Sequence, residues 1–256
     1  MNPDKPGTPA DLIRPERYPR SSTYDPAWLM SLDMGPNPLW QLEDLLPDLA
    51  LQPGQRVLDL GSGKGATSVF LARECGATVV AADLWVSAAE ATDNFVAAGV
   101  SDLVTAVNAD VRSLPFADGE FDAVVSIDAF EYFGTDVHLL PTLLRVLKPG
   151  GRLAMSTPGL ATDPYDGPLP DYVRELAGWE AACWHSPQWW HRHWELSGLV
   201  GNIRSRWQSG GRDDWLLWAR SGGEKHGPVG ADPVIRMLEQ DVDEQLGFTL
   251  ISATKN

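Results

Sequence analysis

The sequence predicts an α/β fold: a doubly wound, Rossmann-like sheet of seven mostly parallel strands with helices on both faces. Between residues 56 and 157, short apolar segments rich in β-branched residues alternate with amphipathic segments, and parallel strands need crossover connections of this kind. The length of 256 residues is enough for one domain with a large core. We also expect an N-terminal lid and an insertion after the fifth strand.

Each element follows from its local pattern. The strand pattern occurs, in chain order, at 56–60, 78–83, 103–110, 121–128 and 151–157. Apolar residues recur at helical spacing in the intervening segments 65–75, 84–99 and 135–147. Two further strands are expected at 202–208 and 214–220, which bring the main sheet to seven, and the C-terminal appendage ends in an apolar stretch at 248–254. Further helices are expected at 38–51, 186–196 and 232–246. Pro38 suits the first turn of the first of these helices.

The chain is expected to divide into three parts. Residues 1–37 form an N-terminal arm or lid, 38–220 the main domain, and 221–256 a C-terminal appendage with a linker, a short helix and a last strand. Within the main domain, 158–186 is rich in proline, glycine and aspartate. A loop this long in a compact domain more often forms a lid or substrate wall than a passive connection, so we interpret it as a substrate cap.

Composition excludes several classes of partner. A net charge of -15 and a pI of about 4.6 argue against nucleic acid and anionic membranes. Two cysteines are too few for a disulfide framework, which fits a reducing cytosol. The N-terminus lacks the apolar core of a signal peptide, and no segment approaches the roughly 18 apolar residues of a membrane span. We expect a cytoplasmic protein that binds a small molecule; the sequence predicts no particular oligomeric state.

The most informative stretch is "VLDLGSGKGAT", residues 57–67, where a glycine-rich turn follows an apolar strand. A phosphate-binding P-loop needs Gly-Lys followed by Ser or Thr, whose hydroxyl reaches magnesium. Here Lys64 is followed by Gly65 and Ala66, so the P-loop interpretation fails. A dinucleotide fingerprint, G-x-G-x-x-G/A, is satisfied by the same stretch, and Asp83 lies about where a ribose-binding carboxylate belongs.

Asp59 argues against a dinucleotide, because a carboxylate at the end of the first strand would repel a pyrophosphate held by the adjacent glycine turn. Acidic residues also close the next three strands: Asp83, Asp110 and Asp128. Ligands of open α/β sheets bind at these carboxyl ends. The crevice should therefore favour a positively charged ligand with hydroxyl groups and no phosphate, a description that S-adenosylmethionine meets.

Four segments resemble the ordered motifs of the class I S-adenosylmethionine-dependent methyltransferases. These are "VLDLGSGKG" (57–65), "AADLW" (81–85), "NADVRSLPFADGEFDAVVSIDAF" (108–130) and "LLRVLKPGGRLAMSTPG" (143–159). The resemblance extends over about 38–160. It implies S-adenosylmethionine as the cofactor and methyl transfer as the activity.

The resemblance also implies a role for each cofactor-binding residue. Gly61, Ser62 and Gly63 would pass under the methionine end, where Asp59 orients the amino group and Asp128 lies near the transferred methyl. Asp83 would hold the ribose hydroxyls, with Leu84 or Trp85 against the adenine. Asp110 would accept a hydrogen bond from the adenine amino group, and the Val111 amide would donate to a ring nitrogen. In an N-terminal lid, Tyr24 and Trp28 would close over the methionine end, unless they only pack a surface arm.

Glu131, just after the fourth strand, is the first candidate for a general base or for the counter-ion of an amine substrate; the alternative is a solvent-facing helix cap. His185 is the second candidate, with a packing role as its alternative. The chain lacks the Asn/Asp-Pro-Pro-aromatic motif of methyltransferases that act on DNA bases or protein glutamine, which favours a small-molecule acceptor. Two other functions stay open: a nicotinamide-dependent oxidoreductase and a non-catalytic S-adenosylmethionine-binding protein.

The segment 178–194 holds five tryptophans and three histidines. His191 and His193 are two residues apart and point to different sides of a helix, so we expect no metal site. Trp179 and Trp184 are candidates for a substrate wall, because aromatic faces suit apolar or cationic groups.

Overall fold

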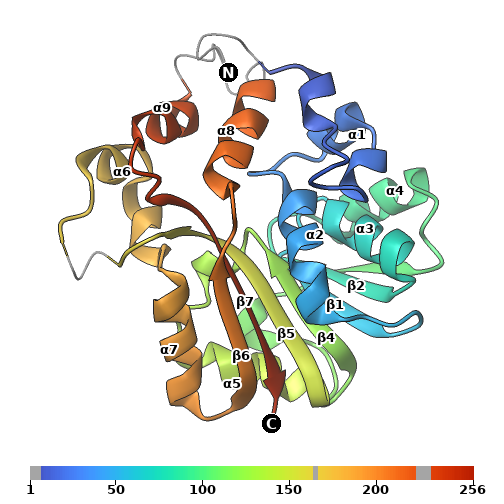
Figure 1. The fold of residues 1–256 in the computed structure, drawn as a ribbon. Coiled ribbons are helices and arrows are strands. Elements are labelled where there is room, and N and C mark those ends of the chain that lie inside the picture. The colour runs from blue at the N-terminus through green and yellow to red at the C-terminus, as the bar shows by residue number, and fades with distance from the viewer. Residues whose placement is uncertain (1–6, 164–166, 223–231) are drawn as a thin grey trace.

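A computed structural model describes residues 7–163, 167–222 and 232–256 and has one seven-stranded sheet in the order β3-β2-β1-β4-β5-β7-β6 (Figure 1). The strands are β1 Arg56–Leu60, β2 Thr78–Asp83, β3 Val104–Asn108, β4 Phe121–Ile127, β5 Leu147–Leu160, β6 Val200–Trp207 and β7 Leu246–Lys255. Strands β1 to β5 pair in parallel, whereas β7 is antiparallel to both of its neighbours. The predicted fold class is confirmed.

Helices cover both faces of this sheet. They are α1 Pro26–Ser31, α2 Pro38–Leu49, α3 Ala66–Cys75, α4 Ala88–Ala97, α5 Leu139–Val146, α6 Asp171–Leu176, α7 Pro187–Ser197, α8 Gly211–Ser221 and α9 Pro233–Gln240. Local signals fix several starts: the Asn37 side chain caps α2 before its proline, Ser87 caps α4 and Ser186 caps α7. The predicted helix at 232–246 is shorter than expected.

Side chains alternate between the two faces of the sheet along each strand, so the core forms two layers, one on each face. Val57 faces the cluster formed with α2, α3, α4 and α8, whereas its neighbour Leu58 faces the cluster formed with α5 and α7. Strands buried on both faces are mostly apolar, and nearly every residue of β1, β2 and β4 is buried here. This packing leaves the carboxyl ends of the strands, with their polar residues, free to form a site.

The segment 214–220, expected to be a strand, is instead part of helix α8. Trp215 and Trp218 are spaced three residues apart, and both are buried. Asp213 and Asp214 stand in the first turn, where acidic residues stabilise a helix. The prediction at 214–220 is therefore wrong; the sheet keeps seven strands because the C-terminal stretch supplies β7, which lies between β5 and β6.

A third apolar cluster joins the insertion after β5 to the C-terminal helices. It contains Leu160, Val173, Ala181, Trp184, Trp215, Met237, Leu238, Leu246 and Phe248. These residues come from α6, the 3-10 turn η6 (Gly178–Cys183), α8, α9 and the end of the sheet. The insertion therefore has a small core of its own above the carboxyl ends of the strands.

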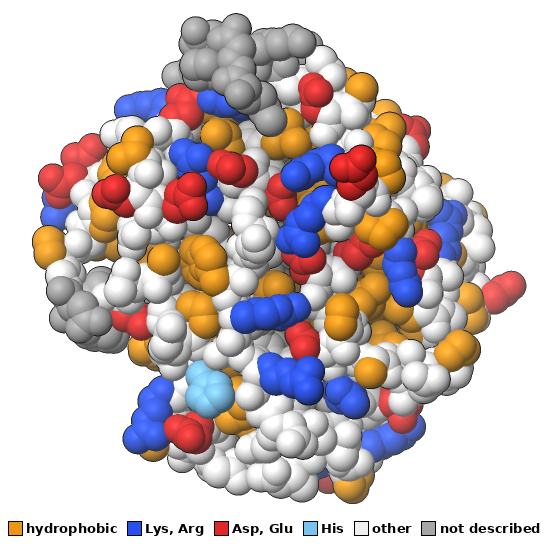
Figure 2. All heavy atoms as spheres, in the orientation of Figure 1, with side chains coloured by type: hydrophobic (Ala, Val, Ile, Leu, Met, Phe, Trp, Pro, Cys, Tyr) orange, Lys and Arg blue, Asp and Glu red, His pale blue; other side chains and the backbone are white. Residues whose placement is uncertain are grey.

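On the face drawn in Figure 2, basic and acidic side chains are interspersed rather than gathered into patches of one sign. At the β6 edge, two arginines pair with one carboxylate of α2: Arg204 and Arg206 lie 3.4 and 2.9 Å from Asp48. Within the described ranges, none of the helices is long and apolar enough to cross a membrane.

Candidate cofactor and acceptor site

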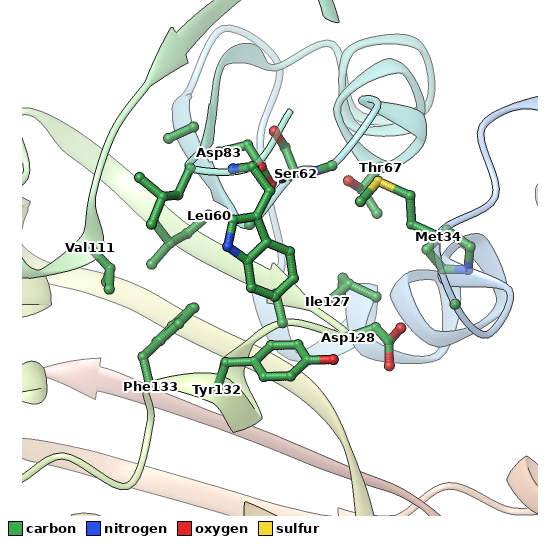
Figure 3. Close-up of a pocket in the computed structure, with 18 of the residues that line it drawn as sticks. Met34, Leu60, Ser62, Thr67, Asp83, Val111, Ile127, Asp128, Tyr132 and Phe133 are labelled. Carbon is green, nitrogen blue, oxygen red and sulfur yellow. Dashed lines mark hydrogen bonds between the residues drawn. The ribbon is translucent and has the colours of Figure 1, made fainter. Parts of the chain in front are cut away.

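A cavity of about 500 Å³ opens at the carboxyl ends of β1 to β4. The loops that follow these strands form its walls, and one further wall comes from residues 32–38 before α2. Val111 and Phe133 lie at one end of the cavity, and Met34 and Asp128 at the other (Figure 3). The two ends can therefore be described separately.

The glycine turn between β1 and α3 forms one wall. Gly61 has a left-handed φ of +71°, and a Cβ there would overlap with the Cβ of Ala129 in the loop after β4. Ser62 is 7 % exposed and lines the cavity, and among the described residues its hydroxyl has no hydrogen-bond partner. A buried hydroxyl of this kind is what a polar ligand would satisfy.

Asp83, at the end of β2, is held by backbone amides. It accepts hydrogen bonds from Gly63 N at 2.8 Å, Trp85 N at 2.7 Å and Val86 N at 2.8 Å. A pyrophosphate-binding turn directs such amides at the phosphate. Here the amide of Gly63 already binds a carboxylate, so the turn presents negative charge to the ligand.

Asp59 lies behind the wall rather than in it. It is 1 % exposed, and one carboxylate oxygen accepts hydrogen bonds from the hydroxyls of Thr67 and Ser68, both at 2.6 Å. Burial raises the pKa of Asp59 to about 6, and the charge of Asp83 adds to the rise. Thr67 does line the cavity, so Asp59 reaches a ligand only through this hydroxyl.

At the opposite end of the cavity from Met34, Asp110 and Val111 line the wall as expected, but the carboxylate of Asp110 already accepts hydrogen bonds. It accepts from the Arg112 backbone amide and from Arg112 Nε, both at 2.9 Å. These side-chain and backbone hydrogen bonds lower the pKa of Asp110 to about 2. Leu84 and Trp85 also line the cavity, and both are more than half exposed.

Asp128 and Glu131 lie close together after β4. Asp128 lines the cavity in a left-handed conformation (φ 54°), and burial together with the charges of Glu131, Glu180 and Asp33 raises its pKa well above the usual range. Glu131 is 3 % exposed and accepts from the Thr157 hydroxyl at 3.0 Å; burial raises its pKa to about 7. The solvent-facing alternative for Glu131 is wrong, because the carboxylate is buried.

A row of aromatic rings runs from the cavity mouth to the cap. Tyr132 lies 5.3 Å from Trp85 and 6.1 Å from Trp179 between ring centroids. Trp85 and Trp179 are 70 % and 69 % exposed, so each has a face available to a ligand. Trp184, by contrast, is buried against Trp215 in the core of the cap.

Four expected site residues do not line the cavity: Asp59 and Glu131, described above, and Tyr24 and His185. Tyr24 is 7 % exposed, packs on Phe70 and Trp28, and donates its hydroxyl to Glu74 at 3.2 Å. His185 is also buried; its ring stacks on Trp189 with centroids 3.7 Å apart, and burial lowers its pKa. The packing interpretation fits Tyr24 and His185 in this structure.

The sequence did not predict four residues that cover the end of the cavity near Asp128: Leu32, Met34, Gly35 and Pro36. It also missed Thr67 and Phe133 in the walls. The prolines and glycine of 35–38 indicate a turn, but nothing local indicates where that turn packs.

Residues 58–155 match a family model described as a methyltransferase domain. Over 115 residues the chain is 36 % identical to the methyltransferase GfsG of Streptomyces halstedii, covering 44 % of this chain and 41 % of that protein. Over 141 residues it is 39 % identical to a demethylmenaquinone methyltransferase of Clavibacter sepedonicus, covering 54 % and 56 % of the two chains. The chain thus spans about half the length of the curated relatives it matches.

Among solved structures, the chain resembles the geranyl diphosphate C-methyltransferase of Streptomyces coelicolor A3(2), with a TM-score of 0.65 and 21 % identity over 84 % of this chain and 78 % of that one. It also resembles the [4+2]-cyclase SpnF, with a TM-score of 0.68 and 19 % identity over 86 % of this chain and 82 % of that one. Likeness at these identities concerns the fold.

The family match, the curated relatives and the sheet order agree. Residues 58–155 are thus similar to a methyltransferase domain, and the sheet has the order seen in Figure 1.

Proposed function

We propose that the protein transfers a methyl group from S-adenosylmethionine to a small-molecule acceptor. The observation that carries this proposal is the hydrogen bond from Gly63 N to Asp83, because an amide that a dinucleotide fold would direct at a phosphate is here already bound to a carboxylate. The buried, unpaired hydroxyl of Ser62 and the acidic side chain of Asp128 fit a ligand with both hydroxyls and positive charge.

The proposed cofactor residues divide along the cavity. Asp83 binds the ribose hydroxyls, and Asp110 with Val111 binds the adenine. Ser62 and Asp128 bind the methionine part, with Asp59 acting through Thr67. When bound, the cofactor supplies an electrophilic methyl group on a sulfonium.

Glu131 is the proposed catalytic residue at the acceptor side. With a pKa raised to about 7, its carboxylate is a better base than an ordinary glutamate and is largely ionised above neutrality. It can take the proton that an oxygen or nitrogen nucleophile loses, or hold a cationic acceptor as a counter-ion. The charge of Glu180 raises the pKa of both Glu131 and Asp128, so the cap insertion contributes to this acidic environment.

The small-molecule acceptor and the cytoplasmic location rest on the sequence: an acidic chain and the absent motif for DNA-base or protein-glutamine acceptors. The exposed rings of Trp85 and Trp179 support an acceptor with apolar or cationic groups.

Two measurements test the proposal. Calorimetry with S-adenosylhomocysteine should show binding, and NADH should not bind. Turnover of labelled S-adenosylmethionine on a panel of small hydroxyl, amine and activated-carbon compounds should then identify an acceptor. The turnover assay is needed because a similar fold also occurs in a protein named as a [4+2]-cyclase, which is a different reaction. Binding without any turnover would favour a non-catalytic or different role.

A further inference from the structure

Residues 33–36 lie at the end of the N-terminal arm (1–37) and form the wall of the proposed methionine end of the cavity. These four residues alone are called the lid below. The sulfur of Met34 lies 2.9 Å from the position of a Cβ built on Gly63, so it contacts the glycine turn. Gly35 packs so closely on Asp128 that a Cβ there would overlap with the carboxylate. The lid therefore touches both loops that would hold the methionine part of a cofactor.

One buried side chain from a distant helix holds the lid in this place. The indole Nε1 of Trp218, on α8, donates to the carbonyl oxygen of Gly35 at 2.8 Å and to Asp33 Oδ1 at 3.1 Å. These two acceptors flank Met34 in the chain. Trp218 is 3 % exposed, so water cannot readily replace its hydrogen bonds.

A second anchor on α8 fixes the other end of the arm. Asp214, one helical turn before Trp218, accepts from the hydroxyl of Tyr18 and from the guanidinium of Arg14. Between the anchors, Trp40 packs against both Tyr18 and Trp218, with ring centroids 5.3 and 6.2 Å apart. The lid is thus the end of an arm that is fastened twice to one turn of α8.

We propose that Trp218 is the positioning residue of the lid, and that its indole N–H sets the affinity of the site for the methionine half of the cofactor. This inference rests on the proposed function. Without the N–H, conformations in which the lid leaves Asp128 become more populated, and the apparent affinity falls with the fraction of molecules that are competent to bind. Trp218 does not line the cavity, so its effect passes through the lid.

The proposal predicts selectivity along the ligand. The lid contacts the loops of Gly63 and Asp128, whereas the adenosine end is formed by Asp83 and Asp110. A ligand that lacks the amino-acid part, such as 5′-methylthioadenosine, should therefore be insensitive to Trp218. A purely structural loosening would weaken both ligands alike.

The test is calorimetry on Trp218→Phe, which keeps an aromatic ring and removes the donor. S-adenosylhomocysteine should bind about tenfold more weakly than to the unmodified protein, while 5′-methylthioadenosine should change less than about twofold. Trp190→Phe is the matched control: Trp190 is fully buried, and its indole N–H has no hydrogen-bond partner among the described residues. Equal loss for both ligands, or no loss for either, would overturn the proposal.

A second variant covers the case in which Trp218→Phe fails to fold. Gly35→Ala adds a methyl group that must move the lid away from Asp128, and it should produce the same selective loss. Unchanged S-adenosylhomocysteine binding in this variant would contradict the lid's contact role. If the unmodified protein binds 5′-methylthioadenosine but not S-adenosylhomocysteine, the lid does not contribute to binding the methionine part, and the inference is wrong. If it binds neither ligand, the proposed function itself is wrong.

Discussion

The two ends of the cavity are built in different ways. The proposed adenosine end consists of residues at the ends of neighbouring parallel strands. Asp110 is held by an amide of its own loop, and Asp83 by amides of its own loop and of the adjacent glycine turn. The methionine and acceptor end brings together the lid, the loop after β4 and the cap, which are far apart in the sequence. The first end is set by local backbone geometry, and the second depends on the packing of distant segments.

This difference suggests how variants should behave. Changes at the adenosine end should weaken every ligand that carries a nucleoside. Changes at the other end should separate ligand binding from turnover, or one part of the ligand from another. The predictions below use this separation, beginning with the largest expected effect.

The largest effect is expected from Glu131→Gln, which keeps the size of the side chain and removes its charge. With an acceptor identified in the substrate panel, kcat should fall by about 10²-fold or more if Glu131 is the base. In the unmodified protein the rate should rise with pH through about 7, as Glu131 ionises, and this rise should disappear in the variant. Steady-state kinetics measured from about pH 6 to about pH 9 test both effects.

Calorimetry on Glu131→Gln supplies the control. The affinity for S-adenosylhomocysteine should differ from that of the unmodified protein by less than about twofold, because Glu131 is not one of the residues that line the cavity. A loss that appears mainly in the KM of the acceptor would identify Glu131 as a counter-ion instead of a base. Turnover close to that of the unmodified protein at every pH would remove it from the site.

Asp83→Ala should have the next largest effect. It removes charge-assisted hydrogen bonds to the ribose, so affinities for S-adenosylhomocysteine and 5′-methylthioadenosine should both fall about a hundredfold. The parallel loss distinguishes this residue from Trp218. Because three backbone amides also lose their acceptor, the melting temperature of the ligand-free protein should fall as well. Unchanged binding of both ligands would place the ribose elsewhere.

The smallest effect is expected from Asp59→Asn, and it concerns stability. The pKa of Asp59 is raised from 3.8 to about 6 in the folded protein, so protonation favours the folded state. This contribution is complete below about pH 4 and is lost as pH rises through about 6. The neutral variant should therefore be more stable than the unmodified protein at pH 8, by up to about 3 kcal/mol, with a smaller difference at pH 5.

Urea unfolding at the two pH values measures this difference, with Thr67→Val as a variant that removes one hydroxyl donor and keeps the charge. Cofactor binding by Asp59→Asn should weaken even though the protein becomes more stable. If Asp59→Asn is less stable than the unmodified protein at pH 8, the hydrogen bonds that the Asp59 carboxylate accepts from Thr67 and Ser68 outweigh the cost of burying its charge.

The sequence predicted correctly that Asp83 and Asp110 lie in the cavity wall at the ends of their strands, because the signals for this are local. An acidic residue at the end of a strand, followed by a turn, places Asp83 and Asp110 without any knowledge of distant contacts. The mistaken strand at 214–220 has a different origin: Trp215 and Trp218 suit a buried strand or a buried helix equally by composition. Only the partners on α2 and in the cap decide between them.

Dependence on distant contacts also explains why the sequence did not predict the position of the lid. Tyr24 was expected over the methionine end because it is aromatic and lies in the N-terminal arm, yet it packs on Phe70 instead. Met34 and Gly35 take that place because Trp218 binds the chain beside them. Nothing within a few residues of Met34 in the sequence carries this information, since the donor comes from the far end of the domain.

Calorimetry on the unmodified protein tests the central claim most directly. At physiological ionic strength, S-adenosylhomocysteine should bind with one site per chain, and NADH should give no heat of binding under the same conditions. The acidic turn, in which Gly63 N binds Asp83, predicts this result because a pyrophosphate would meet negative charge there. Tight binding of NADH together with no binding of S-adenosylhomocysteine would contradict the account.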